Sequence, residues 1–171
     1  DLDEADKQLF AKTINQSCDL LLVLINDILE VSRLQSGQMK FEKESCSVKE
    51  LVDDLYLAHQ LLVPTHLRFS KEAEGDLFIY TDKKRLSQVI TNFLTNACKF
   101  TNSGYIKLGF KHLRGTDEAA IFVEDSGIGL SEEEQEKVFS RFFKQDEFSQ
   151  GAGLGLSICQ GIVQNLGGRI A

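Results

Sequence analysis

The first 36 residues carry an apolar pattern that a long helix with a partner can satisfy. Its members recur at alternating intervals of four and three residues, the spacing of a heptad seam: Phe10, Ile14, Ser17, Leu21, Leu24, Ile28 and Val31. A second stripe runs beside it: Cys18, Leu22, Ile25 and Leu29. Two adjoining stripes are too wide for a two-stranded coil and suit a bundle of three or four helices. We predict a helix over about residues 5–36, ended by Gly37 and covered by another helix or another copy of the chain.

The rest of the chain mixes helix and strand signals in an irregular order. Helices are predicted over about residues 48–63, 83–100, 131–142 and 154–166, and strands over about 67–71, 78–80, 105–113 and 119–124. Capping boxes at Ser47 with Glu50 and at Ser131 with Glu134 mark two of the helix starts. Such an order predicts an α+β sandwich in which helices cover one face of a sheet.

The charge balance limits the classes of partner. Acidic residues number 26 against 19 Lys and Arg, a net charge of −7. Nucleic-acid affinity depends on neutralising phosphates, so we expect no nucleic-acid partner, although a nucleotide needs only a few local cations. The four cysteines are widely spaced, as in a reduced cytoplasmic protein. No apolar run approaches the roughly 20 residues of a membrane span, so we expect this stretch to be cytoplasmic without membrane contact, whether or not the complete protein is anchored elsewhere.

A first polar cluster interrupts the apolar helix predicted over residues 83–100. Asn92, Asn96 and Lys99 recur at intervals of four and three residues, which places them along one face. Asparagine has a poor helix propensity, so two in line with a lysine indicate a function. An amide oxygen can bind Mg²⁺ and an ammonium group can bind phosphate, although a solvated helix face would show the same pattern.

A second cluster, Asp125-Ser-Gly127-Ile-Gly129, directly follows the apolar strand predicted over residues 119–124. Glycines at alternate positions let the backbone lie close to a flat ligand. A carboxylate at the end of the strand can accept a hydrogen bond from an exocyclic amine. Taken alone, the cluster is explained equally well by a simple turn.

A third cluster, Gly151-Ala-Gly153-Leu-Gly155-Leu156, opens the last predicted helix. Glycines before a helix start can form an anion site from free amides and the positive end of the helix dipole. The spacing differs from the Gly-x-Gly-x-x-Gly of dinucleotide-binding folds, and the chain contains no Gly-x-x-x-x-Gly-Lys-Ser/Thr phosphate loop. Both of those nucleotide-binding folds are therefore disfavoured.

In this order and at these separations, the clusters resemble the ATP-binding domain of two-component sensor histidine kinases, whose superfamily includes DNA gyrase and a heat-shock chaperone. Residues 92–101 resemble its asparagine box, 125–130 its first glycine box, 139–144 its phenylalanine box and 151–158 its second glycine box. Residues 25–42 are similar to the second helix of the family's dimerisation domain and its exit.

The resemblance implies three segments. Residues 1–37 would be the second helix of the dimerisation and phosphoacceptor bundle, residues 38–46 a linker, and residues 47–171 the ATP-binding catalytic domain, truncated at its C-terminus. That domain is an α/β sandwich in which a mixed sheet carries helices on one face.

The resemblance also implies ATP and Mg²⁺ as cofactors and assigns roles to residues. Asn96 should bind Mg²⁺, with Asn92 beside it and Lys99 near the phosphates, and Asp125 should recognise the adenine amino group. The other residues expected to contact the nucleotide are Gly127, Ile128, Gly129, Leu130, Phe143, Lys144, Gly151, Gly153, Leu154, Gly155 and Leu156. Residues 131–150 should form a lid, and Ala152 stands where relatives often have a polar side chain.

The family's phosphoacceptor is a histidine followed by glutamate and, nearby, proline. His59, His66 and His112 all lack this context, so we expect them to be ordinary surface or packing residues. The acceptor is then expected on a helix preceding this stretch, which makes the chain a fragment of a kinase that is not competent alone. The resemblance further implies a homodimer through the N-terminal helix and relay of the phosphoryl group to an aspartate of a response-regulator receiver domain.

Two alternatives stay open. An ATP-driven conformational switch, as in the gyrase and chaperone relatives, would normally carry a catalytic glutamate at the position of Asn92, and an asparagine cannot act as a general base. A degenerate nucleotide-binding scaffold is the other alternative, suggested by Ala152 although the boxes are otherwise intact.

Overall fold

The computed structural model describes residues 3–113, 115–116, 118–145 and 152–171. The chain divides into two compact units, residues 1–39 with 137–158 and residues 40–136 with 159–171. Helices and strands follow one another as α1 (Glu4–Gln35), β1 (Glu44–Ser47), α2 (Val48–His59), β2 (Leu67–Glu72), β3 (Phe78–Thr81), α3 (Lys83–Phe100), β4 (Gly104–His112), β5 (Ala119–Asp125), α4 (Glu132–Lys137) and α5 (Gly155–Leu166). The segment boundaries predicted near residues 37 and 46 stay a prediction.

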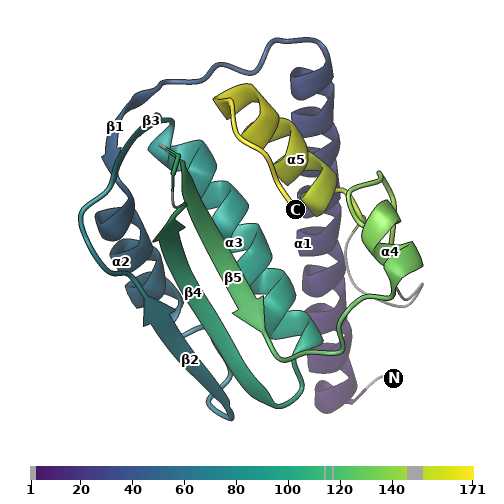
Figure 1. The fold of residues 1–171 in the computed structure, drawn as a ribbon. Helices are drawn as coiled ribbons and strands as arrows, with labels where there is room; N and C mark the ends of the chain where they lie inside the picture. Colours follow the sequence, from purple (N-terminus) through teal and green to yellow (C-terminus); the bar gives the residue numbers. More distant parts are fainter. Residues whose placement is uncertain (1–2, 114, 117, 146–151) are drawn as a thin grey trace. The chain divides into compact units, whose positions relative to one another are not determined.

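The first unit is built on α1, the long helix drawn in purple in Figure 1. Asp3 caps its start by accepting a hydrogen bond from the Asp6 amide at 2.7 Å, and Gly37, with φ +65°, follows its end as predicted. At the far end of α1, the Gln35 side-chain oxygen, oriented to face the guanidinium, accepts hydrogen bonds from both Arg141 Nη atoms at 2.7 and 2.6 Å.

Much of the apolar face predicted for α1 is exposed. Ile14 is 61% exposed and Leu21 57%, and other large apolar side chains along the helix are also open to solvent: Leu9, Phe10, Leu20, Leu22, Val23, Ile25, Ile28 and Leu29. Only Leu24 and Val31 of the predicted seam are half-buried. A face of this size needs a partner, because large contiguous apolar patches on a single soluble chain usually mark an interaction site.

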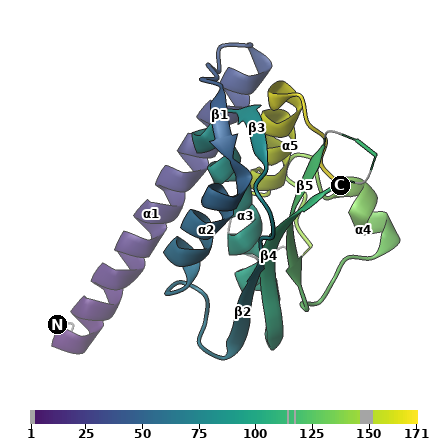
Figure 2. The same ribbon diagram turned by 60° about the vertical axis from the view of Figure 1, so that its left-hand side comes forward.

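The second unit contains a mixed sheet in the order β2-β4-β5. β4 pairs parallel with β2 and antiparallel with β5, while β1 and β3 form a separate antiparallel pair. α2 and α3 pack on one face of the three-stranded sheet, as Figures 1 and 2 show. This confirms the predicted α+β fold with a mixed sheet and helices on one face.

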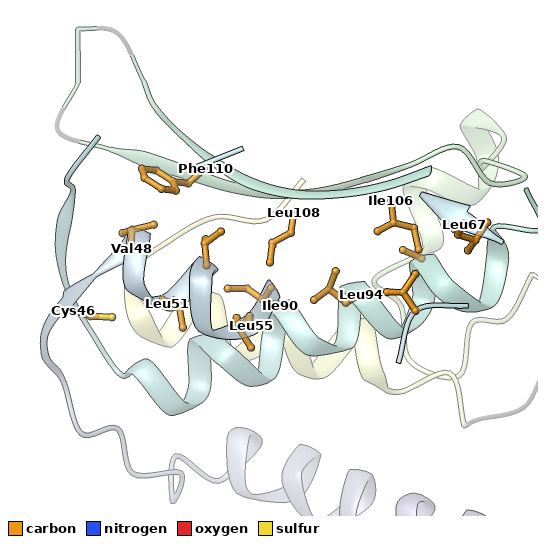
Figure 3. Close-up of a cluster of buried hydrophobic side chains, with 13 residues drawn as sticks. Cys46, Val48, Leu51, Leu55, Leu67, Ile90, Leu94, Ile106, Leu108 and Phe110 are labelled. Atoms are coloured by element: carbon orange, nitrogen blue, oxygen red, sulfur yellow. The ribbon is translucent and has the colours of Figure 1, made fainter. Parts of the chain in front are cut away.

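The core of this unit lies between those helices and the sheet (Figure 3). Ile106, Leu108 and Phe110 point inward at alternate positions of β4. They meet apolar side chains from β1, α2, the segment before β2, β2 itself and α3: Cys46, Val48, Leu51, Val52, Leu55, Val63, Leu67, Ile90, Leu94 and Ala97. The intervening β4 residue Lys107 faces the opposite side of the sheet. There its Nζ atom lies 3.7 Å from Glu72 Oε2 and 3.6 Å from Glu124 Oε2. The charged face explains why only one side of the sheet carries helices.

Two helices end earlier than predicted. α2 ends at His59 because the amides of Gln60 and Leu62 donate to the carbonyls three residues back, those of Leu57 and His59, which tightens the chain into a turn before Pro64. α4 ends at Lys137 because Phe142, with φ +63°, leaves the helical conformation and donates its amide to the Gly153 carbonyl at 2.9 Å. In both places the chain leaves the helix by replacing i→i−4 hydrogen bonds with others.

Candidate functional site

The predicted polar stripe lies on α3 as expected. Asn96 Nδ2 donates to Asn92 Oδ1 at 3.2 Å, so the two half-buried amides face the same way. Lys99 is exposed one turn further on, and its ammonium group lies 4.9 Å from the centre of the Phe100 ring. Core side chains such as Leu94 occupy the opposite face of the helix.

The end of α3 is bonded to the loop that follows β5. The Ile128 amide donates to the Phe100 carbonyl at 3.2 Å. Gly127 lies so close to the end of the helix that a Cβ atom there would be 2.5 Å from the Phe100 carbonyl oxygen. Only glycine allows this approach without displacing the backbone. The structure therefore brings the asparagine stripe and the first glycine cluster together within one unit.

The Asp125 carboxylate is held from two directions. Its Oδ1 atom accepts hydrogen bonds from the Gly127 amide at 2.8 Å and from the Thr101 hydroxyl at 3.3 Å. Within the described part of the chain Oδ2 accepts no hydrogen bond, and the residue is exposed. A carboxylate oriented in this way has an oxygen ready to accept from a ligand amine.

Beside that carboxylate the loop presents apolar side chains to solvent. Ile128 is 62% exposed and Leu130 38%, and Gly129 between them has φ +69°. An exposed isoleucine next to a hydrogen-bonding carboxylate suits a flat heteroaromatic ring, whose face is apolar and whose edge is polar. All five residues that the sequence predicts in residues 125–130 thus lie on one exposed loop.

Sequence reasoning missed two hydroxyl groups that shape this loop, those of Thr101 and Ser126. The Ser126 hydroxyl accepts from the Tyr105 amide at 2.8 Å and donates to the Ser103 carbonyl at 3.2 Å, which fixes the loop to the start of β4. Both residues lie inside the sequence motifs, so the sequence alone could have drawn attention to them. Their hydrogen-bond partners lie more than twenty residues away along the chain and could not be identified from the sequence.

The second glycine cluster belongs to the other unit. Gly153 has φ +68°, and a Cβ atom there would lie 2.5 Å from the Phe143 carbonyl oxygen. Leu154 is only 2% exposed and its carbonyl accepts from the Ser157 hydroxyl at 2.7 Å, while the half-buried Gly155 and Leu156 begin α5. A tight glycine turn therefore leads into a helix start, where backbone amides lack intrahelical partners and favour an anion.

The remaining predicted residues lie near this turn or outside the described chain. Phe143 is half-buried and Lys144 is exposed, both in the segment that binds to Gly153 through Phe142. Gly151 and residues 146–150 of the predicted lid lie outside the described residues. The site residues are thus divided between the units, with Asn92, Asn96, Lys99 and residues 125–130 in the second, and Phe143, Lys144 and residues 153–156 in the first.

The asparagine pair fits a hard divalent cation. The side-chain nitrogen of Asn96 donates the hydrogen bond to Asn92, so the side-chain oxygen of Asn96 is turned away from that bond. Within the described residues this oxygen accepts no hydrogen bond. Mg²⁺ prefers oxygen ligands and is typically held by one or two protein groups together with substrate phosphates and water. One oriented amide oxygen matches that pattern.

Among the residues that the structure describes, no helix combines the length and the apolarity needed to cross a bilayer.

Comparisons with known proteins agree with this arrangement. The family model of histidine kinase-, DNA gyrase B- and HSP90-like ATPases matches residues 81–171. The aerobic respiration control sensor protein ArcB homolog of Haemophilus influenzae is 32% identical over 173 residues, covering 98% of this chain and 52% of the relative. The chain thus spans about half the length of that relative.

Two solved structures are similar over 98% of the chain. Full-length ShkA in complex with AMPPNP has a TM-score of 0.83 and 25% identity, and this chain covers 35% of it. Histidine kinase ThkA in complex with the response regulator protein TrrA has a TM-score of 0.77 and 26% identity, with 47% of that chain covered. Because the family model covers more than half of the sequence and its expected fold and motifs are present, the chain belongs to the family of histidine kinase-, DNA gyrase B- and HSP90-like ATPases.

Proposed function

We propose that this chain is the ATP-binding catalytic domain of a sensor histidine kinase, carried on the second helix of its dimerisation bundle. The observation that carries the proposal is the bonding of the α3 end to the loop after β5, which places an oriented amide pair and an oriented carboxylate in one unit. The structure of ShkA, to which nearly the whole of this chain is similar, contains the ATP analogue AMPPNP.

In this proposal Asp125 recognises the base. Its Oδ2 atom accepts a hydrogen bond from the adenine amino group, and Gly127, Ile128, Gly129 and Leu130 line the ring. The amides around residues 153–156 bind the phosphates at the start of α5, together with Gly151 of the same glycine cluster and with Phe143 and Lys144 of the lid.

The asparagine stripe serves the phosphate end of the nucleotide. Asn96 holds Mg²⁺ with Asn92 beside it, and Lys99 places a cation near the phosphates. When bound, the metal neutralises charge on the phosphate oxygens. Phosphoryl transfer depends mainly on positioning and charge stabilisation, which are the contributions that these residues can make.

The γ-phosphoryl group is transferred to a histidine nitrogen outside this stretch and then to an aspartate of a response-regulator receiver domain. The bond between the γ-phosphorus and the bridging oxygen of ATP breaks as the nitrogen–phosphorus bond forms, and ADP leaves. ThkA, a similar structure, is a histidine kinase in complex with a response regulator protein.

Dimerisation through α1 completes the proposal. The exposed apolar side chains of α1 would be covered by the other helices of a bundle formed by two copies of the protein. A cytoplasmic position of this domain follows from its proposed substrate, ATP, and its receiver-domain partner.

Calorimetric titration with ATP and GTP in the presence of Mg²⁺ tests the nucleotide assignment. ATP should bind, and GTP should bind at least about tenfold more weakly, because guanine presents a carbonyl oxygen where adenine has an amine. Asp125→Asn should weaken ATP binding about tenfold or more, since a hydrogen bond to a charged group contributes about 1.5–3 kcal/mol. Its matched control is Glu124→Gln, an exposed neighbour bonded to Tyr105 instead. Equal affinity of the unmutated chain for both nucleotides would overturn the adenine assignment.

A further inference from the structure

Thr101 occupies an unusual place for a hydroxyl side chain at the end of a helix. It is the residue after α3, it is only 3% exposed, and its amide still donates to the Ala97 carbonyl at 3.0 Å. Its hydroxyl donates to Asp125 Oδ1, 24 residues further along the chain. A buried hydroxyl is costly unless it is hydrogen-bonded, so this contact decides which way the side chain points.

The Thr101 hydroxyl and the Gly127 amide share one acceptor atom. Both donate to Asp125 Oδ1, at 3.3 and 2.8 Å, and leave Oδ2 without a donor among the described residues. Two donors on the same oxygen restrict rotation of the carboxylate, because turning it would break both hydrogen bonds. Threonine suits this role, since β-branching restricts its first side-chain torsion.

We propose that Thr101 is a positioning residue for purine recognition: its hydroxyl holds Asp125 Oδ1 so that Oδ2 is presented to the 6-amino group of the base. The inference rests on the proposed nucleotide function and adds to it a group that need not touch the ligand. The 3.3 Å separation is long for an O–H···O bond, so it can shorten when the base binds, as hydrogen bonds at functional sites often do.

A comparison of two nucleotides separates this role from general support of the fold. ATP carries the 6-amino group, whereas purine riboside triphosphate has the same sugar, phosphates and ring system without it. Thr101→Val should weaken ATP binding about threefold to tenfold, as expected for the loss of one hydrogen bond. The affinity for purine riboside triphosphate should stay within about twofold, and Thr101→Ser, which keeps the hydroxyl, should restore most of the preference for ATP.

The ratio of the two affinities, measured by calorimetry, decides the question. A fold defect lowers the active fraction for both ligands alike and leaves the ratio unchanged. If Thr101→Val does not fold, Thr101→Ala carries the same comparison, since alanine needs less room. In the Asp125→Asn background the valine substitution should have no further effect on the ratio, because the two residues act through the same carboxylate.

Two results would overturn the inference: an unchanged ratio in both hydroxyl-deleting variants, whether the two affinities stay the same or fall together, or additive effects of the Thr101 and Asp125 substitutions. These differ from a failure of the nucleotide proposal itself. If the unmutated chain bound neither triphosphate, the proposed function would fail. If it bound ATP in an Asp125-dependent way but ignored the Thr101 substitutions, only the positioning role would fail.

Discussion

Asn96 has two side-chain atoms to which the proposal gives different tasks: the nitrogen donates to Asn92, and the oxygen would bind Mg²⁺. Asn96→Ala should therefore remove most of the Mg²⁺ dependence of ATP binding and leave the affinity for adenosine, which has no phosphates, nearly unchanged. Calorimetric titrations with and without Mg²⁺ measure both. Thr95→Ala is the matched control, because Thr95 lies next to Asn96 and donates its hydroxyl to the Thr91 carbonyl instead. Parallel losses for ATP and adenosine would point to a folding defect.

Individual residues were predictable from sequence where a local period revealed them. The spacing of Asn92 and Asn96 indicated a shared helix face, and the 3.2 Å hydrogen bond between them confirms it. Thr101 and Ser126 could not be assigned in this way, because their partners are set by how β4, β5 and the end of α3 come together. Sequence spacing alone does not report the distances between side chains on these different elements.

Among the elements, α3 depends on a carboxylate at its start. Asp82 accepts hydrogen bonds from the Arg85 amide at 3.0 Å and from the Glu42 amide at 2.9 Å. Burial would by itself raise the pKa of Asp82, but these hydrogen bonds outweigh it and hold the pKa below its usual range. The ionised Asp82 therefore stabilises the folded state fully above about pH 4, the usual pKa of an aspartate in an unfolded chain. This stabilisation is lost as the pH falls through the lower pKa that Asp82 has in the folded state.

Asp82→Ala should accordingly lower the free energy of unfolding at pH 7 by about 1–2 kcal/mol, the usual effect of losing an N-cap. The difference from the unmutated chain should shrink as the pH falls below about 4. Asp82→Asn is the control: its oxygen can still cap the helix, but it does not titrate. Urea unfolding at a series of pH values measures these differences. If the Asp82→Asn chain lost stability with acid as steeply as the unmutated chain, the role of this carboxylate would be refuted.

The exposed apolar face of α1 leads to a prediction about self-association of the chain. Replacing Leu21 and Ile28, both more than half exposed on the apolar face of α1, with glutamate should convert a self-associating chain into a monomer, because charges cannot be buried in a bundle. Gln16→Glu with Asn26→Glu adds the same charge away from both apolar stripes and should leave the assembly intact. Analytical ultracentrifugation reports the state of each chain. An unmutated chain that stays monomeric at high concentration would contradict dimerisation through α1.

Element types were readable from sequence to a larger extent than element ends. The heptad spacing predicted α1, and a strand was predicted over about residues 105–113, where the structure has β4. The ends of α2 and α4 were predicted too late, because the Leu62 amide donates three residues back to the His59 carbonyl and the Phe142 amide donates to the Gly153 carbonyl, instead of making the i→i−4 bonds of a continued helix. Local propensity does not report such competition.

For the molecule as a whole, the proposal predicts what the chain cannot do alone. Incubated with labelled ATP, it should not become stably phosphorylated, because transfer needs a histidine held in line with the γ-phosphate at about 3–3.5 Å. His59 is buried with Nδ1 2.8 Å from the Leu55 carbonyl oxygen, and His66 and His112 lie outside α1. Adding a separate segment with the acceptor histidine should restore labelling on that segment. Acid-labile phosphate mapped to His59, His66 or His112 would contradict this account.

The grouping of the chain into units was beyond the reach of the sequence. Residues 137–158 cluster with α1, and one of the contacts is the pair of hydrogen bonds from Arg141 to Gln35, more than a hundred positions apart. Arg141 lies within the phenylalanine box at residues 139–144 and Gln35 within the helix-exit segment at residues 25–42, but neither pattern pairs the two side chains. A glutamine next to a helix end and an arginine in a loop are common everywhere, so only their positions in three dimensions identify them as partners.

The buried hydrophobic cluster of the second unit has a consequence for the order of events during synthesis. All of its members lie between Cys46 and Phe110, and none comes from the glycine turn at Gly153 or from α5. A ribosome working at about 5–20 residues per second needs roughly 2–9 s to add residues 111–153, which end at the glycine turn. Collapse of a small core is much faster than that. The core of the second unit can therefore begin to assemble on the ribosome before the glycine turn at Gly153 has been translated.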